Sequence, residues 1–469
     1  MSSMEKEQIL KINKRSFITV CVILVSFMVL AYALTFFLGK GEYITVGENL
    51  VYQELPGKGY SFLSFITAPF RLLGSADGIS VIVIALFMLI LAGSFNIMHE
   101  TGGITSIIGY LIKRFRNNKF KLMYIVILSF MLFGALFGIF EESVTLLPII
   151  IMLALSLGWD TFTGLGMCLL AAGFGFSTAI TNPFSIGLGA AKMGISPTTN
   201  IWYRIIIFIL MYLFLCLFMR IHVKRIEKDP KSSPTYESDE ARREKLKQFS
   251  LDYDRKTLKV YSLFFLAVLI AIAASSTISV LSSYSIPIIA LTFLVGIMVS
   301  GACLRIPFKK LMKMFASGVA GMSPAIIMLM LAGSIKFIMD DAKIMATLIE
   351  ATANAFKSQS PLLGVLFIYL LVLVIQFFIG SASAKVILII PIISVLASEI
   401  GITKNLALLA FVFADGYTDL IYPTNPVLLI ALGMASFNYG KWIKKTWILQ
   451  AIILIVTVGF LILGYYINY

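Results

Sequence analysis

The sequence predicts an all-α polytopic membrane protein whose two halves are inverted repeats. The 469 residues are 59% hydrophobic and 13% charged, with a mean hydropathy of +0.94, which lies outside the range of soluble domains. Residues 88–94 read MLILAGS and residues 328–334 read MLMLAGS, so the chain is duplicated. A constant offset of 243 residues then relates four landmarks, namely Pro148 to Pro391, Gly158 to Gly401, Gly173 to Gly416, and Thr181-Asn182-Pro183 to Thr424-Asn425-Pro426.

Apolar stretches of about 20 residues can cross a bilayer as helices, and nine stretches approach or reach this length. The first follows a polar, basic segment and lacks a small-residue cleavage site, so it is expected to be retained as a helix. The predicted crossings are 16–39, 78–98, 161–183, 200–222, 257–278, 283–303, 319–338, 403–425 and 446–468.

Two further regions, 120–157 and 361–398, are predicted to be re-entrant hairpins. Each contains a full-length apolar arm, a polar tip and a second arm of about 14 residues, which at 1.5 Å per residue is too short to cross. Irregular backbone at membrane depth is tolerated only where protein or a water-filled cavity surrounds it. The tips are therefore expected to line a shared cavity.

Basic residues set the expected orientation. With the N-terminus in the cytoplasm and the C-terminus outside, 26 Lys and Arg fall in cytoplasmic segments and seven in external ones. The copies at 78–98 and 319–338 then cross in opposite directions, which makes the halves inverted repeats. The span 283–303 has no counterpart in the first half, where 43–63 is expected to be a polar external loop.

The expected division of the chain follows from this threading. Residues 1–222 form the first repeat, with its hairpin and a broken helix at 161–190. Residues 257–469 form the second, with its hairpin and a broken helix at 403–436. The segment 223–256 between them is rich in both charges and is predicted to be a solvated cytoplasmic linker.

The composition also excludes some classes of function. The net charge of +14 resides in loops between spans, where anionic lipid and topology explain it, so no nucleic-acid partner is expected. The four cysteines and two histidines lack metal-ligand spacing. No catalytic residues, ATP-binding loop or cofactor motif are recognised, and an enzyme is not expected.

Two tripeptides, Thr181-Asn182-Pro183 and Thr424-Asn425-Pro426, are predicted to break the helix after each hairpin. Proline removes a backbone donor and disfavours helix at the preceding residue. The broken ends would expose carbonyls and helix N-termini, which suit cations and carboxylates. A pair of structural kinks capped by the asparagines is the alternative. The predicted substrate-binding residues are Glu141, Glu142, Ser143, Asn182, Ser381, Ser383, Lys385, Asp415, Asp419 and Asn425.

Charged residues at mid-membrane are costly and usually mark function. Glu141, Asp415 or Asp419 could meet a substrate ammonium or coupling cation, and Lys385 a substrate carboxylate. A structural bridge between Lys385 and one acid is the alternative. Oxygen-rich tips suit hard cations. Candidate sodium sites are Ser143, Thr145, Ser177, Thr178, Thr181 and Asn182 in the first half, and Ser381, Ser383, Thr418, Thr424 and Asn425 in the second.

Hairpin, broken helix and inverted copy together resemble the ion transporter superfamily of elevator-type carriers. Within it, the segments 140–148 (FEESVTLLP) and 171–183 (AAGFGFSTAITNP) look like the YfcC branch of the DcuC-type anaerobic dicarboxylate carriers. The resemblance implies that each tip and its helix break form half of one binding site, and that the protein is a homodimer in the bacterial inner membrane. Related carriers bind sodium and carboxylates at Ser-Asn-Thr tips, but neither tip here has the amide.

The leading functional hypothesis is an elevator-type secondary transporter of a small carboxylate-bearing solute, embedded in the lipid bilayer. The acidic residues favour an amino acid, with exchange of the arginine/ornithine type, and sodium ions are candidate coupling ions. A sodium- or proton-coupled C4-dicarboxylate carrier is the alternative within this class. A passive ion or solute channel is the alternative of another class.

Overall fold

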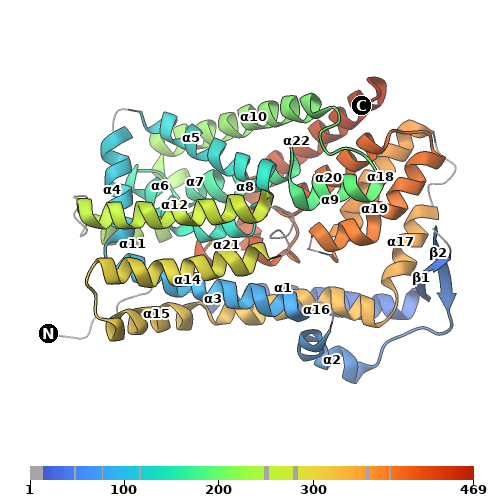
Figure 1. Ribbon diagram of the computed structural model, residues 1–469, viewed down its shortest axis with the longest axis horizontal. Helices are drawn as coiled ribbons and strands as arrows, with labels where there is room; N and C mark the ends of the chain where they lie inside the picture. Colours follow the sequence, from blue (N-terminus) through green and yellow to red (C-terminus); the bar gives the residue numbers. More distant parts are fainter. Residues whose placement is uncertain are drawn as a thin grey trace.

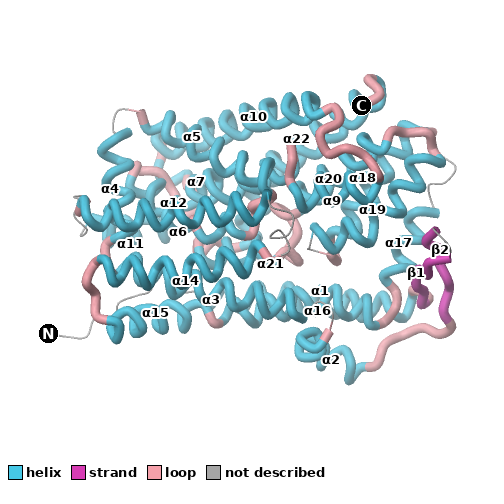
Figure 2. The backbone as a smooth tube through the Cα atoms, viewed as in Figure 1, coloured by secondary structure: helices cyan, strands magenta, loops and turns pink. Residues whose placement is uncertain are grey.

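The computed structural model describes residues 14–46, 49–75, 78–115, 118–247, 253–277, 284–354, 360–379 and 382–469. Helices dominate this part of the chain, and one two-stranded hairpin interrupts them (Figure 2). Most helices run close to the long axis of the molecule (Figure 1), as the apolar stretches of the sequence predict for a membrane protein.

The first half contains the more interrupted helices. Its regular elements are α1 (Lys14–Phe37), β1 (Lys40–Val46), β2 (Asn49–Leu55), α2 (Phe62–Arg71), α3 (Gly78–Glu100), α4 (Gly103–Phe115), α5 (Lys119–Leu132), α6 (Leu147–Ser156), α7 (Thr161–Leu165), α8 (Ala171–Ser177), α9 (Leu188–Met193) and α10 (Ile201–Lys228). Single 3-10 turns lie at Leu72–Gly74 and Glu142–Thr145, and π-helical turns at Phe133–Phe137, Gly166–Leu170 and Pro183–Gly187.

The linker and the second half follow. Their elements are a 3-10 turn at Pro230–Ser232, α11 (Tyr236–Lys247), α12 (Arg255–Thr277), α14 (Ser285–Cys303), α15 (Phe308–Met322), α16 (Pro324–Asp341), α17 (Met345–Asn354), α18 (Pro361–Gln376), α19 (Ala382–Glu399), α20 (Lys404–Thr418), α21 (Pro426–Met434) and α22 (Tyr439–Tyr466).

Four described helical segments are long and apolar enough to cross a bilayer, and a bent pair would make a fifth. The four are Val81–Glu100, Lys119–Phe137, Ile201–Lys228 and Tyr439–Tyr466. The bent pair is α15 and α16, which meet at 44°. The predicted crossing 319–338 is therefore wrong in its bounds: it straddles the junction between these helices, where Pro324 lacks the amide hydrogen that a continuous helix would use. The count of nine crossings stays a prediction.

The helices pack in two groups (Figure 1). In one, α1 packs on α16 and α3 packs on both α14 and α15. In the other, α8 packs on α5 and α20, and α20 packs on α18, α19 and α22. The predicted hairpins 120–157 and 361–398 correspond to α5 with α6 and to α18 with α19, and both lie in this second group.

The expected polar loop at 43–63 instead forms a β-hairpin followed by α2. The strands pair antiparallel with Tyr43 opposite Tyr52, and the two rings meet at a centroid distance of 5.8 Å. Aromatic and β-branched residues such as Ile44 and Val51 favour extended backbone. The hairpin is tied to α17 because the Tyr43 hydroxyl donates to Glu350 at 3.0 Å. The fold class needs this correction from all-α to mainly α.

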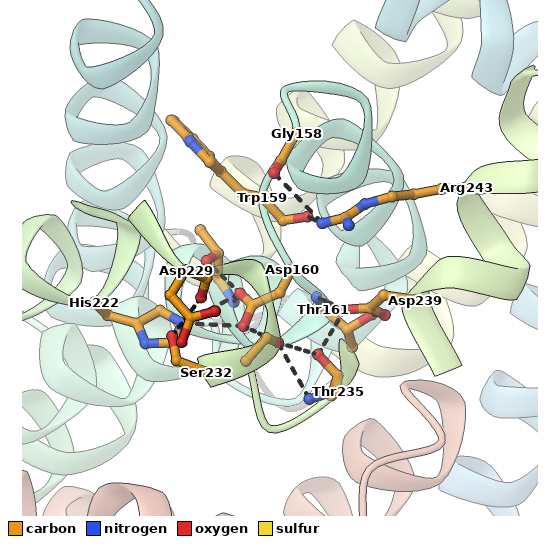
Figure 3. Close-up of polar contacts among 12 residues, drawn as sticks. Gly158, Trp159, Asp160, Thr161, His222, Asp229, Ser232, Thr235, Asp239 and Arg243 are labelled. Carbon is orange, nitrogen blue, oxygen red and sulfur yellow. Dashed lines mark hydrogen bonds and ion pairs between the residues drawn. The ribbon is translucent and has the colours of Figure 1, made fainter. Parts of the chain in front are cut away.

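The linker 223–256 is not merely a solvated connection. It begins inside α10, and its α11 packs against the α6–α7 junction (Figure 3). Asp239 of α11 is fully buried and accepts from the Thr161 amide at 2.8 Å and from the Thr161 hydroxyl at 2.5 Å. Arg242 donates to Thr161 Oγ1 at 2.9 Å and to Ser436 Oγ, just after α21, at 3.2 Å. The linker therefore contacts both halves of the chain.

Asp160, at the start of α7, is the centre of the same polar cluster (Figure 3). Its carboxylate caps the helix by accepting from the Thr163 amide at 2.8 Å, and also contacts Ser233 Oγ at 2.7 Å and His222 Nε2 at 3.1 Å. Burial raises the pKa of Asp160, but the contacts with His222, Thr163 and Ser233 outweigh it and lower the pKa to about 2. The α6–α7 junction thus carries an ionised, fully partnered carboxylate.

Candidate functional site

The first hairpin tip packs directly on the first helix break. A π-helical turn ends the long arm at Gly138, whose φ of 71° belongs to the left-handed region that favours glycine. A Cβ there would lie 2.5 Å from Asn182 Oδ1, so the glycine allows tip and break to meet. The Ala135 carbonyl accepts from the amides of Ile180, Thr181 and Asn182 at 2.9, 3.1 and 3.1 Å.

The two asparagines hold their helix breaks in matching geometry. Asn182 Oδ1 accepts from the amides two and three residues later at 2.9 and 3.3 Å. Asn425 Oδ1 does the same at 2.8 and 3.4 Å. A side-chain oxygen is needed there because proline follows each asparagine and the first turn has orphan amides.

The amide groups of the asparagines differ between the halves. Asn425 Nδ2 donates to Asp419 Oδ1 at 2.6 Å. Asn182 is fully buried, yet its Nδ2 has no hydrogen-bond partner among the described residues, and neither has the hydroxyl of buried Ser185. A buried donor without a partner costs about 1–3 kcal/mol, which a ligand oxygen would offset.

An ion pair lies in the interior of the second half. Lys385 of α19 pairs with Asp415 of α20, and both side chains are 0% exposed. Beyond this pair, neither charged end has a hydrogen-bond partner among the described residues. Asp419 lies one turn further along, where Gln376 Nε2 donates to its Oδ1 at 2.8 Å. The same Nε2 donates to the Asp415 carbonyl at 3.3 Å.

Glu141 is the acidic residue of the first tip whose side chain the structure describes. Glu141 has no hydrogen-bond or ion-pair partner within the described part of the chain, and its side chain lines a cavity between the first tip, α3 and α21. Within the described residues, Lys385 is paired with Asp415, Asp419 accepts from the side-chain amides of Gln376 and Asn425, and Glu141 is left without a partner.

The two broken helices cross at a pair of equivalent glycines. A Cβ on Gly416 would lie 2.3 Å from the Cα of Ser177, and a Cβ on Gly173 would lie 2.6 Å from the Leu420 side chain. The offset of 243 residues relates Gly173 to Gly416 and Ser177 to Leu420. The residue that Gly416 contacts, Ser177, is therefore equivalent to the residue that Gly173 contacts, Leu420. Two equivalent contacts of this kind are the pattern of an isologous interface around a two-fold axis.

Most of the candidate sodium residues whose side chains are described already donate a hydrogen bond to a backbone carbonyl. Ser143, Ser177, Thr178, Thr181 and Thr418 each donate a side-chain hydroxyl to a nearby carbonyl, at 2.6 to 3.2 Å. Their oxygen lone pairs stay available to a cation. Thr424 is buried.

Four predicted site residues cannot be placed in this geometry. Ser381 lies outside the described residues, and the side chains of Glu142, Thr145 and Ser383 also fall outside the description. Within the described residues, no group of three or more His, Cys, Asp or Glu side chains could hold a metal ion.

Two site residues were missed by sequence reasoning. Gln376 bridges Asp415 and Asp419, and the signal for it was a lone amide at the end of the apolar segment Pro361–Gln376. Ser185 lies next to Asn182, because the Ser185 backbone amide donates to Asn182 Oδ1 at 3.3 Å. Nothing in the sequence marked Ser185 except its position two residues after Pro183.

A family model and two relatives match this chain over most of its length. A family model described as the C4-dicarboxylate anaerobic carrier family, DcuC, matches residues 17–466. The chain is 28% identical over 446 residues to the "Putative basic amino acid antiporter YfcC" of Escherichia coli strain K12, covering 91% of this chain and 86% of that protein. It is 23% identical over 375 residues to an uncharacterized Haemophilus influenzae protein, covering 79% and 72% of the two chains.

Two solved transporters also match over nearly their whole length. The Alcanivorax borkumensis YdaH transporter is 18% identical with a TM-score of 0.49, covering 96% of this chain and 99% of its own. Neisseria gonorrhoeae MtrF, described within a class of antimetabolite efflux pumps, is 15% identical with a TM-score of 0.46, covering 96% of each chain. On the family model, which spans residues 17–466, the chain belongs to the DcuC family of C4-dicarboxylate anaerobic carriers.

Proposed function

We propose that this transporter exchanges amino acids that carry a cationic side chain, by an elevator-type alternating-access mechanism. The single observation that carries the proposal is the Glu141 carboxylate, which lines a cavity and has no hydrogen-bond or ion-pair partner among the described residues, while Lys385 is paired with Asp415. Uncompensated charge at membrane depth is costly. A solute with an additional positive charge reduces this cost when it binds, whereas a doubly anionic solute increases it.

The polar groups of the site give each part of such a solute a partner. Glu141 offers a carboxylate without a partner to an ammonium or guanidinium group. Lys385 and the free amide of Asn182 offer donors to the α-carboxylate. Sodium ions at the hydroxyl and carbonyl oxygens of the two breaks remain candidate coupling ions.

Exchange, rather than uniport, follows from the same charges. An empty site would have to cross the membrane with negative charge uncompensated, and burying unpaired charge is unfavourable. A loaded site is closer to neutral and crosses at lower cost. The relative named as a basic amino acid antiporter supports this proposal. We also propose that α1, α3, α15 and α16 form the static scaffold of a homodimer, against which the hairpins and broken helices move.

A C4-dicarboxylate carrier is the second candidate, because the matching family model carries that description. In that case Lys385 and the amide of Asn182 would bind the two carboxylates. Protons or sodium ions would then have to neutralise Glu141 and Asp419, because one lysine cannot balance three carboxylates and a dianion.

A counterflow screen in proteoliposomes distinguishes the candidates. Vesicles are loaded with unlabelled arginine, ornithine, a neutral amino acid, succinate or a short fatty acid, and uptake of the labelled solute is measured with and without sodium. We expect saturable counterflow of arginine and ornithine. Succinate counterflow with no response to amino acids would overturn the proposal, and flux without any counterflow would indicate a channel.

A further inference from the structure

A partly open cavity lies where the two groups of helices meet. One wall is α3, where Phe87, Leu91 and Phe95 line the cavity at intervals of four residues and so share one helix face. The opposite wall is α21, which contributes Val427 and Ile430. The cavity therefore lies between a helix that packs on α14 and α15 and a helix that follows the second break.

The lining combines one acidic group with apolar walls. Among the described residues that line the cavity, Glu141 of the first tip is the charged one, and the others are apolar. A carboxylate without a partner beside an apolar wall is unfavourable. A single cation would offset this cost, and the rest of a molecule that carries it would have to be apolar to suit the walls.

Methionines make the apolar lining adaptable. Met88, Met322 and Met434 all line the cavity, and they are 7%, 3% and 8% exposed. Their unbranched thioether side chains adjust to ligands of different shape. The lining therefore suits a class of apolar molecules of varied shape, aliphatic or aromatic.

We propose that this cavity binds hydrophobic monoamines, with the ammonium at Glu141 and the apolar body between α3 and α21. Such a molecule has one polar group at one end, so its whole apolar body can contact the apolar walls. The face from Phe87 to Phe95 is about 12 Å long at 1.5 Å per residue, which exceeds the length of an extended six-carbon chain. The amine and the exchanged amino acid would share only Glu141, and would compete for it.

A bound amine would contact both groups of helices at once. Phe95 belongs to α3 and Met322 to α15, whereas Ile430 belongs to α21. Under the proposed function the two groups move past each other, so a molecule between them opposes the movement. We therefore expect hydrophobic monoamines to inhibit exchange. The inhibition rests on the proposed function, but the binding does not.

Binding is measured without transport, by isothermal titration calorimetry on the purified transporter. The probes are butyl-, pentyl- and hexylammonium, with 1-hexanol as the neutral control and empty micelles as the blank. We expect Kd to fall about fourfold for each added methylene, the fold-change that corresponds to roughly 0.8 kcal/mol per buried methylene. Equal Kd values across the series, or no binding, would overturn the inference.

The charge is tested with Glu141→Gln, which keeps the size of the side chain. This variant should bind hexylammonium about tenfold more weakly or worse, because it loses a hydrogen bond to a charged group. Its affinity for 1-hexanol should not change. Hexylammonium that binds the variant as tightly as the unmodified protein would show that the ammonium does not lie at Glu141.

A matched pair of variants on α3 tests the apolar wall. Leu91→Phe adds volume to the lining and should raise the Kd for hexylammonium about tenfold. Leu86→Phe makes the same change at a side chain that is 55% exposed and outside the lining, and should leave the Kd unchanged. Equal Kd values for the two folded variants would place the amine elsewhere and overturn the inference.

Arginine counterflow, measured in parallel, separates this inference from the proposed function. Hexylammonium should inhibit counterflow, and 1-hexanol at the same concentration should not. Arginine exchange without hexylammonium binding would overturn the inference alone. Hexylammonium binding without any exchange of cationic amino acids would overturn the proposed function alone.

Discussion

At the scale of single residues, Asn182 separates a structural role from a binding role. Its Oδ1 caps the helix break, whereas its Nδ2 has no partner among the described residues. Asn182→Ser keeps a capping oxygen and removes the amide without adding a charge, so we expect near-normal thermal stability but a strong loss of exchange. Asn182→Ala loses the cap as well, at a cost of about 1 kcal/mol.

Thermal unfolding in detergent and counterflow in proteoliposomes measure the two roles separately. The double variant Asn182→Ala, Asn425→Ala should abolish uptake, because both breaks lose their caps and Asp419 loses a donor. Uptake with unchanged affinity in this double variant would show that the site has been assigned to the wrong residues.

The structural role and the binding role of the ion pair between Lys385 and Asp415 can also be measured separately. Asp415→Asn leaves a buried ammonium without its counter-ion, and we expect a loss of about 3–5 kcal/mol in the free energy of unfolding. Replacing both residues, as Lys385→Met with Asp415→Leu, should restore most of the stability and still abolish exchange. Chemical unfolding and counterflow are measured for the unmodified protein, for Asp415→Asn and for the double variant. Normal exchange by the double variant would make the pair a structural bridge only.

At the scale of secondary-structure elements, α11 is expected to stabilise the end of the core at the α6–α7 junction. Asp239→Ala removes three hydrogen-bond acceptor contacts, two to Thr161 and one to Thr235, and hydrogen bonds to charged groups contribute about 1.5–3 kcal/mol each. We expect a clear fall in Tm. Glu237→Ala on the exposed side of the same helix is the matched control and should leave Tm unchanged. Equal Tm values for the two variants would mean that α11 adds no stability.

The capped start of α7 should make stability depend on pH. The pKa of Asp160 is lowered from 3.8 to about 2 in the folded protein, so its stabilising contribution is complete above about pH 4 and is lost as the pH falls toward 2. His222→Gln removes the imidazole that contacts the carboxylate and should move this loss to higher pH. Thermal unfolding between pH 3 and 6 compares the two proteins. Superimposable profiles would show that His222 does not stabilise the carboxylate.

At the scale of the whole molecule, the crossing of α8 and α20 joins the two halves. Gly416→Ala would press a Cβ to within 2.3 Å of the Ser177 backbone, whereas Gly173→Ala would meet only the movable side chain of Leu420. We expect Gly416→Ala to cost about 1–3 kcal/mol and Gly173→Ala less. Gly459→Ala in α22, where a Cβ meets nothing within 4 Å, is the control for denaturant unfolding. A neutral Gly416→Ala would argue against close packing at this crossing.

Much of this architecture could be predicted from the sequence, because helix-breaking residues act locally. The positions of Asn182 and Asn425 before proline predicted both helix breaks, and the 243-residue offset predicted that they are equivalent. The fate of the charged linker could not be predicted in the same way. Burial of Asp239 depends on Thr161, far away along the chain, and composition alone describes such a segment as solvated.

The sequence by itself determined the membrane class, the duplication and the locations of the two breaks, since apolar length, repetition and proline chemistry are properties of neighbouring residues. Tertiary structure decided which acid pairs with Lys385, which asparagine keeps a free amide, and which carboxylate lies against an apolar cavity. Those outcomes depend on which helices pack together, and local sequence does not fix that packing. Asp415 takes the ammonium because α19 packs on α20, and Glu141 is left to the cavity between α3 and α21.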